Sequence, residues 1–153
     1  MKGKVVVITG ATSGIGGVAA QKLAGMGARI VMIARSRDRA EASLSRLRAI
    51  APDQHHSVHY ADLSRLADTK RVAREIASAE PRVDVLINNA GAMFSRRQLS
   101  LDGIELTLAT NHLSYFVLTD GLRKSLLAAG RARIINTSSN AHRRAKIDLD
   151  DLQ

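Results

Sequence analysis

Residues 10–16 have the composition of a turn that binds phosphate groups. Glycines stand at positions 10, 14 and 16, after a run of β-branched residues and where an amphipathic helical pattern begins. In a strand–turn–helix arrangement, the free N–H groups and the positive end of the helix dipole point at whatever fills the turn. Glycine also lets the backbone approach a pyrophosphate without a Cβ in the way. We therefore predict an anion-binding turn, although three glycines in a loop can also be simple turn chemistry.

The spacing of these glycines differs from two better-known phosphate-binding loops. The pattern Gly-x-x-x-Gly-x-Gly departs from the commoner Gly-x-Gly-x-x-Gly fingerprint of dinucleotide-binding proteins. A P-loop is excluded, because Ile15 stands where that motif needs its second glycine and no Lys-Ser/Thr pair follows. The prediction therefore depends on the strand–turn–helix context.

The end of the second expected strand indicates which nucleotide the turn would bind. An acidic residue there binds the ribose 2′-hydroxyl of NAD, whereas an arginine accepts the 2′-phosphate of NADP. Arg35 occupies this place, and its guanidinium can hold a phosphate through two parallel charge-assisted bonds. The nearest acid, Asp38, lies where capping of the next helix explains it. We predict NADP in preference to NAD, the alternative being that Arg35 only coats the surface.

Strands and helices alternate along the chain, which predicts an α/β fold. The expected strands are residues 4–9, 29–34, 56–60, 83–88 and 132–137, and the expected helices are 15–26, 36–50, 65–79 and 102–128. Right-handed crossovers between such units give a parallel sheet covered on both faces. We predict a single NAD(P)-binding domain over residues 1–153, with a Rossmann-type doubly wound sheet of strand order 3-2-1-4-5. Residues 138–153 are expected to form a loop.

Apolar residues at helical spacing predict which helix faces are buried. The expected face of the first helix is Ile15, Val18, Ala19, Leu23 and Met26, and that of the last is Leu113, Phe116, Val117 and Leu122. Gly121 is expected to be either a point of close packing or a kink.

Composition excludes several classes of function. The chain has no cysteine, so disulfides, thiolate metal sites and cysteine nucleophiles are excluded. No carboxylates join His55, His56 and His59 in a metal-ligand pattern, and we predict no metal site. The net charge is +9, but the basic residues are spread over every expected helix and aromatic residues are only 3%, which argues against nucleic acid. No apolar run approaches the ~20 residues that span a bilayer, so a cytoplasmic protein without a membrane partner is expected.

Five motifs in order along the chain resemble the short-chain dehydrogenases/reductases. They are Thr9-Gly10-x-x-x-Gly14-x-Gly16, Asp62-Leu63, Asn88-Asn89-Ala90-Gly91, Asn111-His112-Leu113 and Ile134-Ile135-Asn136-Thr137-Ser138-Ser139. Two strings are most similar to the retinol-dehydrogenase-like branch, Asn111-His112-Leu113-Ser114-Tyr115-Phe116 and Ser138-Ser139-Asn140-Ala141-His142. The resemblance implies an NAD(P)-dependent oxidoreductase that transfers hydride between its cofactor and a small carbonyl or alcohol substrate, and it allows a homo-oligomer.

The resemblance also implies a role for each motif. The residues that would wrap the cofactor pyrophosphate are Gly10, Ser13, Gly14, Ile15 and Gly16. Asp62 would accept a hydrogen bond from the adenine amine, Leu63 would add a backbone contact, and Asn89, Ala90 and Gly91 would line the adenosine side. Taken alone, Asp62 or Ser64 could instead cap the next helix, and residues 89–91 could be a simple turn.

The same resemblance assigns two catalytic residues. Ser139 would hydrogen-bond the substrate oxygen, and Asn111 would position a proton-relay water. The tyrosine and lysine of the family's Tyr-x-x-x-Lys motif are absent, because neither Tyr60 nor Tyr115 has a lysine four residues later. We therefore expect a C-terminally incomplete fold that ends before this motif, and an inactive chain. The alternative is a nucleotide-binding or interaction module without catalysis.

Overall fold

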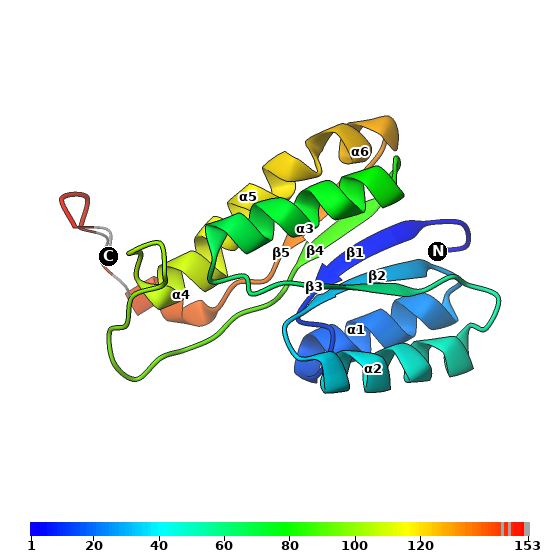
Figure 1. Ribbon diagram of the computed structural model, residues 1–153, viewed down its shortest axis with the longest axis horizontal. Coiled ribbons are helices and arrows are strands. Elements are labelled where there is room, and N and C mark those ends of the chain that lie inside the picture. Colours follow the sequence, from blue (N-terminus) through cyan, green and yellow to red (C-terminus); the bar gives the residue numbers. More distant parts are fainter. Residues whose placement is uncertain (145, 147, 152–153) are drawn as a thin grey trace.

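The computed structural model describes residues 1–144, 146 and 148–151. Over this part of the chain, five parallel strands form one sheet in the order β3-β2-β1-β4-β5, and the predicted fold class is confirmed (Figure 1). The strands are β1 (Val5–Thr9), β2 (Arg29–Ala34), β3 (Ser57–Tyr60), β4 (Val85–Asn88) and β5 (Arg133–Asn136). The predicted loop 138–153 begins with a short 3-10 helix, η2 (Asn140–Arg144), and residues 145, 147 and 152–153 of that loop lie outside the described residues.

Helices cover both faces of this sheet. Helices α1 (Gly14–Gly25) and α2 (Arg37–Ile50) lie on one face, and α3 (Leu66–Ala79), α5 (Ser114–Gly121) and α6 (Arg123–Ala128) lie on the other (Figure 1). Alternate residues of β1 enter the two resulting cores: Val6 and Ile8 pack toward α1 and α2, and Val7 packs toward α3 and α5. Two buried faces explain why β1 and β2 are continuous apolar runs.

The predicted packing face of α1 is wrong in part. Ala19 and Leu23 pack against the core as predicted, whereas Ile15, Val18 and Met26 are exposed. The fully buried positions are the smallest residues of the helix, namely Gly16, Gly17, Ala20 and Ala24. The cause is local, because a Cβ at position 16 would lie 2.4 Å from the Gly10 carbonyl oxygen. The tight turn therefore brings the helix so close to the end of β1 that larger side chains must face outward.

The predicted helix 102–128 is also wrong in part. It begins at residue 106 with α4 (Leu106–Leu108), continues as a π-helix, η1 (Ala109–Leu113), and breaks at Leu122 between α5 and α6. Leu118 and Leu122 are buried, whereas Phe116 is exposed. Gly121 is a point of close packing, because a Cβ there would lie 2.6 Å from the Cβ of Ala73 on α3.

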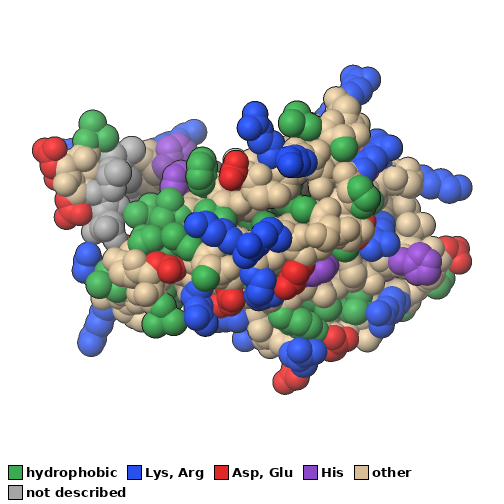
Figure 2. All heavy atoms as spheres, turned by 45° about the horizontal axis from the view of Figure 1, so that its top comes forward, with side chains coloured by type: hydrophobic (Ala, Val, Ile, Leu, Met, Phe, Trp, Pro, Cys, Tyr) green, Lys and Arg blue, Asp and Glu red, His purple; other side chains and the backbone are tan. Residues whose placement is uncertain are grey.

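The basic residues are spread over the surface, as predicted. Lys and Arg side chains are scattered over the whole face seen in Figure 2, with Asp and Glu among them. Strand β5 is an edge of the sheet among the described residues, and Ile134 and Ile135 are each about half exposed. Within the described part of the chain, no helix is long and apolar enough to cross a membrane.

Candidate functional site

A cavity of about 500 Å³ opens at the carboxyl ends of the strands. Ligands of open parallel sheets bind at this edge. Every predicted cofactor-binding residue except Gly14 lines the cavity: Gly10, Ser13, Ile15, Gly16, Arg35, Asp62, Leu63, Asn89, Ala90 and Gly91. Gly14 lies in the turn itself with φ +54°, a conformation that favours glycine. With Thr137, which follows β5, segments from the ends of all five strands meet around one cavity.

The glycine turn is shaped by the loop that follows β4. Gly10 has φ +68°, and a Cβ there would lie 2.9 Å from the Cα of Ala90. A Cβ at Gly16 would lie 2.4 Å from both the Gly10 carbonyl oxygen and the Asn89 amide nitrogen. Ser13, the N-cap of α1, makes no side-chain cap bond among the described residues. The first N–H groups of α1 are therefore not capped by Ser13, and they belong to a segment that lines the cavity, where an anion can accept their hydrogen bonds.

Residues 89–91 are more than a simple turn. The Oγ1 of Thr9 accepts the N–H groups of Asn89 and Ala90 at 2.9 and 2.8 Å. The Asn89 Nδ2 donates to the Thr9 carbonyl at 3.1 Å, and its Oδ1 accepts from Thr137 at 3.3 Å. These bonds join the ends of β1, β4 and β5. This role of Thr9 was not predicted from the sequence, although a hydroxyl at the end of a buried apolar strand indicates a hydrogen-bonding role.

The side chain of Asn111 holds the same loop from the opposite side. Its Oδ1 accepts the Ala92 N–H at 2.9 Å, and its Nδ2 donates to the Ala92 carbonyl at 2.8 Å. Asn111 lies in the π-helix η1, a distortion often found at functional sites. The hydroxyl of Tyr115 donates to the Ala90 carbonyl at 2.8 Å, and burial raises the pKa of this phenol. Both side chains thus position the loop.

The loop after β3 forms another wall of the cavity. The Oδ1 of Asp62 accepts the N–H and the hydroxyl of Ser64 at 3.0 and 2.7 Å, and the Oδ2 of Asp68 accepts the Asp62 N–H at 3.2 Å. The alternative that Asp62 or Ser64 caps the next helix is wrong: the N-cap of α3 is Arg65, without a side-chain cap bond. The Asp62 side chain instead forms an Asx turn, in which it accepts the N–H of the residue two positions later.

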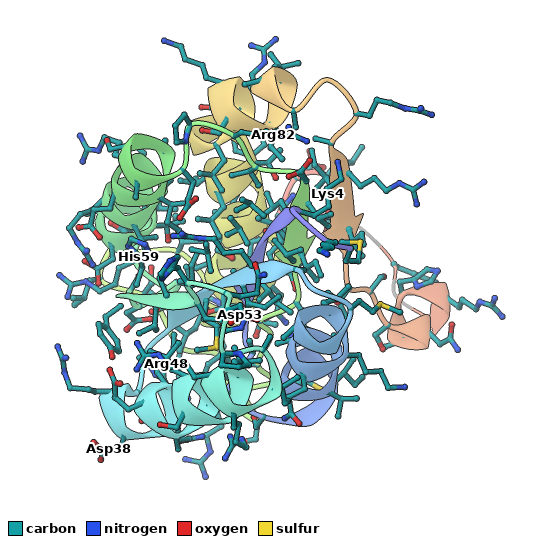
Figure 3. The ribbon with its side chains drawn as sticks, turned by 90° about the vertical axis from the view of Figure 1, so that its right-hand side faces the viewer. Lys4, Asp38, Arg48, Asp53, His59 and Arg82 are labelled. Atoms are coloured by element: carbon teal, nitrogen blue, oxygen red, sulfur yellow. The ribbon has the colours of Figure 1, made fainter. Side chains whose placement is uncertain are left out.

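Three arginines near the start of α2, Arg35, Arg37 and Arg39, differ in what their side chains contact. Arg35 and Arg39 line the cavity together with Ser36. The guanidinium of Arg37 lies 4.3 Å from the centre of the Tyr60 ring. Asp38 is exposed and points away from the body of the molecule (Figure 3). Two cations and no carboxylate therefore reach the cavity from this segment.

Ser139 lies outside the cavity lining, whereas Thr137, two residues before it, is part of that lining. The Ser139 hydroxyl oxygen accepts the Ala141 N–H at 3.2 Å at the start of η2. The side chain is exposed.

Comparison with known proteins gives the family. The family model described as short chain dehydrogenase matches residues 4–148. The chain belongs to the short-chain dehydrogenase family. Human retinol dehydrogenase 13 is 40% identical over 150 residues, which are 98% of this chain and 45% of that protein. The resemblance drawn from the five motifs is thereby confirmed.

Solved short-chain dehydrogenases have the same fold. A metagenomic short-chain oxidoreductase in complex with NADP has a TM-score of 0.77 and 32% identity, with 90% of this chain and 63% of that chain covered. A short-chain dehydrogenase from Sphingobium yanoikuyae in complex with NADPH has a TM-score of 0.77 and 31% identity, with 90% and 54% covered.

The chain spans about half the length of the curated relatives it matches. The matched half carries the glycine turn and the five strand ends that line the cavity. Within the described residues, the cavity has what a dinucleotide needs: open helix N–H groups, a glycine floor without Cβ atoms and two arginines at one end. The residues present therefore fit this group.

Several lining residues were not predicted from the sequence. They are Thr12, Ser36, Arg39, Ser64, Phe94, Leu106, Thr110 and Thr137. Arg39 could have been found, because it lies in the first turn of α2, four residues after Arg35. Phe94 and Leu106 carried no signal, since the path of the long loop between β4 and α4 decides their place.

Proposed function

We propose that this chain is the nucleotide-binding part of an NADP-dependent short-chain oxidoreductase that acts on a carbonyl or alcohol substrate. The observation that carries the proposal is the single cavity into which the glycine turn, the Asp62–Leu63 wall and Arg35 all open. The bound cofactor would supply or accept the hydride. This chain's residues bind and orient it.

Each wall of the cavity has a role in this proposal. The pyrophosphate would be held by the first N–H groups of α1, where Gly10 and Gly16 leave room for it. Asp62 would accept a hydrogen bond from the adenine amine with Oδ2, because its Oδ1 already accepts from Ser64. Leu63 would add a backbone contact. Asn89, Ala90 and Gly91 would line the adenosine side, and Ser13, Gly14 and Ile15 would complete the turn around the pyrophosphate.

The preference for NADP rests on Arg35 and Arg39. Both line the cavity, and no carboxylate of residues 35–39 does. A ribose 2′-hydroxyl would need an acceptor at this place, whereas a 2′-phosphate finds two cations. The Arg37 guanidinium lies over the Tyr60 ring, so we assign no phosphate contact to Arg37.

The test compares two adenine nucleotides that differ only at the 2′ position. We expect 2′,5′-ADP to bind more tightly than 5′-AMP in isothermal titration calorimetry. Loss of one hydrogen bond between charged groups costs about 1.5–3 kcal/mol, so Arg35→Ala should weaken 2′,5′-ADP binding by about 10- to 100-fold. It should leave 5′-AMP binding nearly unchanged. Equal loss for both nucleotides would contradict the 2′-phosphate role, and no binding of either would contradict the proposal as a whole.

The catalytic roles complete the proposal. Ser139 would hydrogen-bond the substrate oxygen, and Asn111 would act by fixing the loop at Ala92, since its side-chain polar atoms are engaged there. A general acid–base contributes about 10²–10⁴ in rate, so a chain without the Tyr-x-x-x-Lys pair should turn over poorly.

Cytoplasmic location, the absence of a membrane partner and a homo-oligomer stay predictions from the sequence.

A further inference from the structure

The segment between β4 and α4 contains a short antiparallel hairpin. Leu99 and Glu105 form its bridge, and the N–H of Ser100 donates to the Ile104 carbonyl at 2.7 Å. Gly103 in its turn has φ +73°. The Ser100 hydroxyl oxygen accepts the N–H groups of Asp102 and Ile104 at 3.2 and 3.4 Å. The hairpin therefore holds Asp102 in place at its tip.

Asp102 reaches from this tip to another part of the fold. Its Oδ2 accepts the N–H of Leu66, the first residue of α3, at 2.8 Å, although the two residues are 36 positions apart. The N-cap residue of α3, Arg65, makes no side-chain cap bond. Helix N-termini have unpaired N–H groups and a positive dipole end, so a carboxylate there is favourable. Asp102, which is remote in sequence, thus caps α3, whereas the N-cap residue Arg65 does not.

The two partners of this bond lie next to two different segments that line the cavity. Leu66 follows closely on the lining residues Asp62, Leu63 and Ser64. Asp102 precedes the lining residues Leu106 and Thr110.

Local hydrogen bonds hold both segments between the Asp102–Leu66 bond and the cavity. On one side, Ser64 and Asp68 hydrogen-bond Asp62. On the other, the carboxylate of Glu105 accepts the N–H groups of Thr107 and Leu108 at 2.9 and 2.7 Å. Because local hydrogen bonds hold each segment, the bond from Asp102 to Leu66 fixes the distance between the segment after β3 and the segment that leads into α4.

We propose that Asp102 is a positioning residue for the adenosine end of the cavity. It joins the hairpin to the start of α3 and so sets the spacing of the two segments that carry the lining residues Leu63 and Leu106. The inference rests on the proposed function, because it needs an adenine nucleotide in that cavity. It goes beyond helix capping, which would stabilise α3 without changing ligand affinity.

The test is binding of 2′,5′-ADP to the full 153-residue chain, measured by calorimetry beside the melting temperature. Asp102→Ala should weaken binding about three- to tenfold, because the walls lose their connection. Asp102→Asn keeps a neutral acceptor and should show a smaller loss. The hairpin itself should survive both changes, since its bridge and the Ser100 bonds do not use the Asp102 side chain.

The control is Ala67→Gly, an exposed position in the first turn of α3. Glycine weakens the start of the helix without touching Asp102, so it should lower the melting temperature and leave the dissociation constant unchanged. Binding by Asp102→Ala within twofold of the wild type would overturn the inference, as would an equal loss in Ala67→Gly. A wild-type chain that binds no 2′,5′-ADP would instead contradict the proposed function.

Discussion

Thr9 and Ala90 are joined by a hydrogen bond of 2.8 Å from the Ala90 N–H to the Thr9 Oγ1, and the same oxygen accepts the Asn89 N–H at 2.9 Å. Thr9 is fully buried at the end of β1, where the chain enters the glycine turn. One hydroxyl therefore fixes the turn and the loop after β4 relative to each other. Both segments line the cavity, so its shape depends on this contact.

Thr9→Val should destabilise the fold and weaken nucleotide binding together. Valine keeps the shape but leaves two backbone N–H groups without an acceptor, which costs about 1–3 kcal/mol for each buried group. Urea unfolding measures the loss of stability, and calorimetry with 2′,5′-ADP measures the loss of affinity. Thr9→Ser keeps the hydroxyl and should stay close to the wild type. A stable valine variant would show that water replaces the threonine.

Gly16→Ala should damage the turn, whereas Gly17→Ala should be tolerated. An alanine Cβ at position 16 would lie 2.4 Å from the Gly10 carbonyl oxygen, so the backbone must shift, with an expected cost of about 1–3 kcal/mol. At position 17 the nearest atom is 3.4 Å away, and alanine favours the helix more than glycine does. Urea unfolding of the two variants makes the comparison. Equal stabilities would contradict the close approach described here.

The parallel sheet and most of the cavity could be predicted from the sequence, because their signals are local. Continuous apolar runs mark strands buried on both faces, and glycines between a strand and a helix mark the phosphate turn. The strand order then follows from the place of that turn. The predicted residues 10, 16, 35, 62 and 89 all reach the same cavity.

The features that sequence reasoning missed depend on the approach of remote segments. The buried face of α1 could be found only in part from hydrophobic spacing, because the distance of the helix from Gly10 decides which side chains fit. The cap of α3 comes from Asp102, which local capping rules do not consider. The bonds of the Asn111 side chain to Ala92 were not predicted, and the role of Asn111 in positioning a proton-relay water stays a prediction.

Asp84 should make the fold sensitive to strong acid. Burial would raise the pKa of this carboxyl, but hydrogen bonds from Lys4, from the Val5 N–H and from Arg82 hold its pKa at about 2. Lys4 and Arg82 lie at the same end of the sheet (Figure 3). Because the pKa is lower in the folded state, the stabilisation is present above pH 3.8 and is lost as the pH falls through about 2.

Asp84→Asn tests this contribution. The shift from 3.8 to about 2 corresponds to about 2 kcal/mol at neutral pH. We expect at least this loss in urea unfolding at pH 7, and a smaller difference from the wild type near pH 2. Asp53→Asn, in an exposed loop, should change little at either pH. A constant difference across this range would show that the carboxylate charge is not what stabilises the strand ends.

His56 should add a second pH dependence near neutrality. Burial lowers the pKa of this imidazole, and the nearby cations Arg29 and Arg48 act in the same direction. Its Nδ1 accepts the Ile30 N–H at 3.0 Å, a bond that only the neutral ring can make. Because the folded pKa lies below 6.5, stability is full above pH 6.5 and falls as the pH drops below it.

His56→Asn should remove this pH dependence, because an asparagine oxygen can still accept the Ile30 N–H but does not titrate. The measurement is the free energy of unfolding at several pH values from neutrality down to about pH 5, on either side of the ordinary histidine pKa. Replacement of the exposed neighbour His55 by asparagine should leave the slope of the wild type in place. If the His56 variant keeps that slope, another group titrates with folding, and the imidazole contributes only its hydrogen bond.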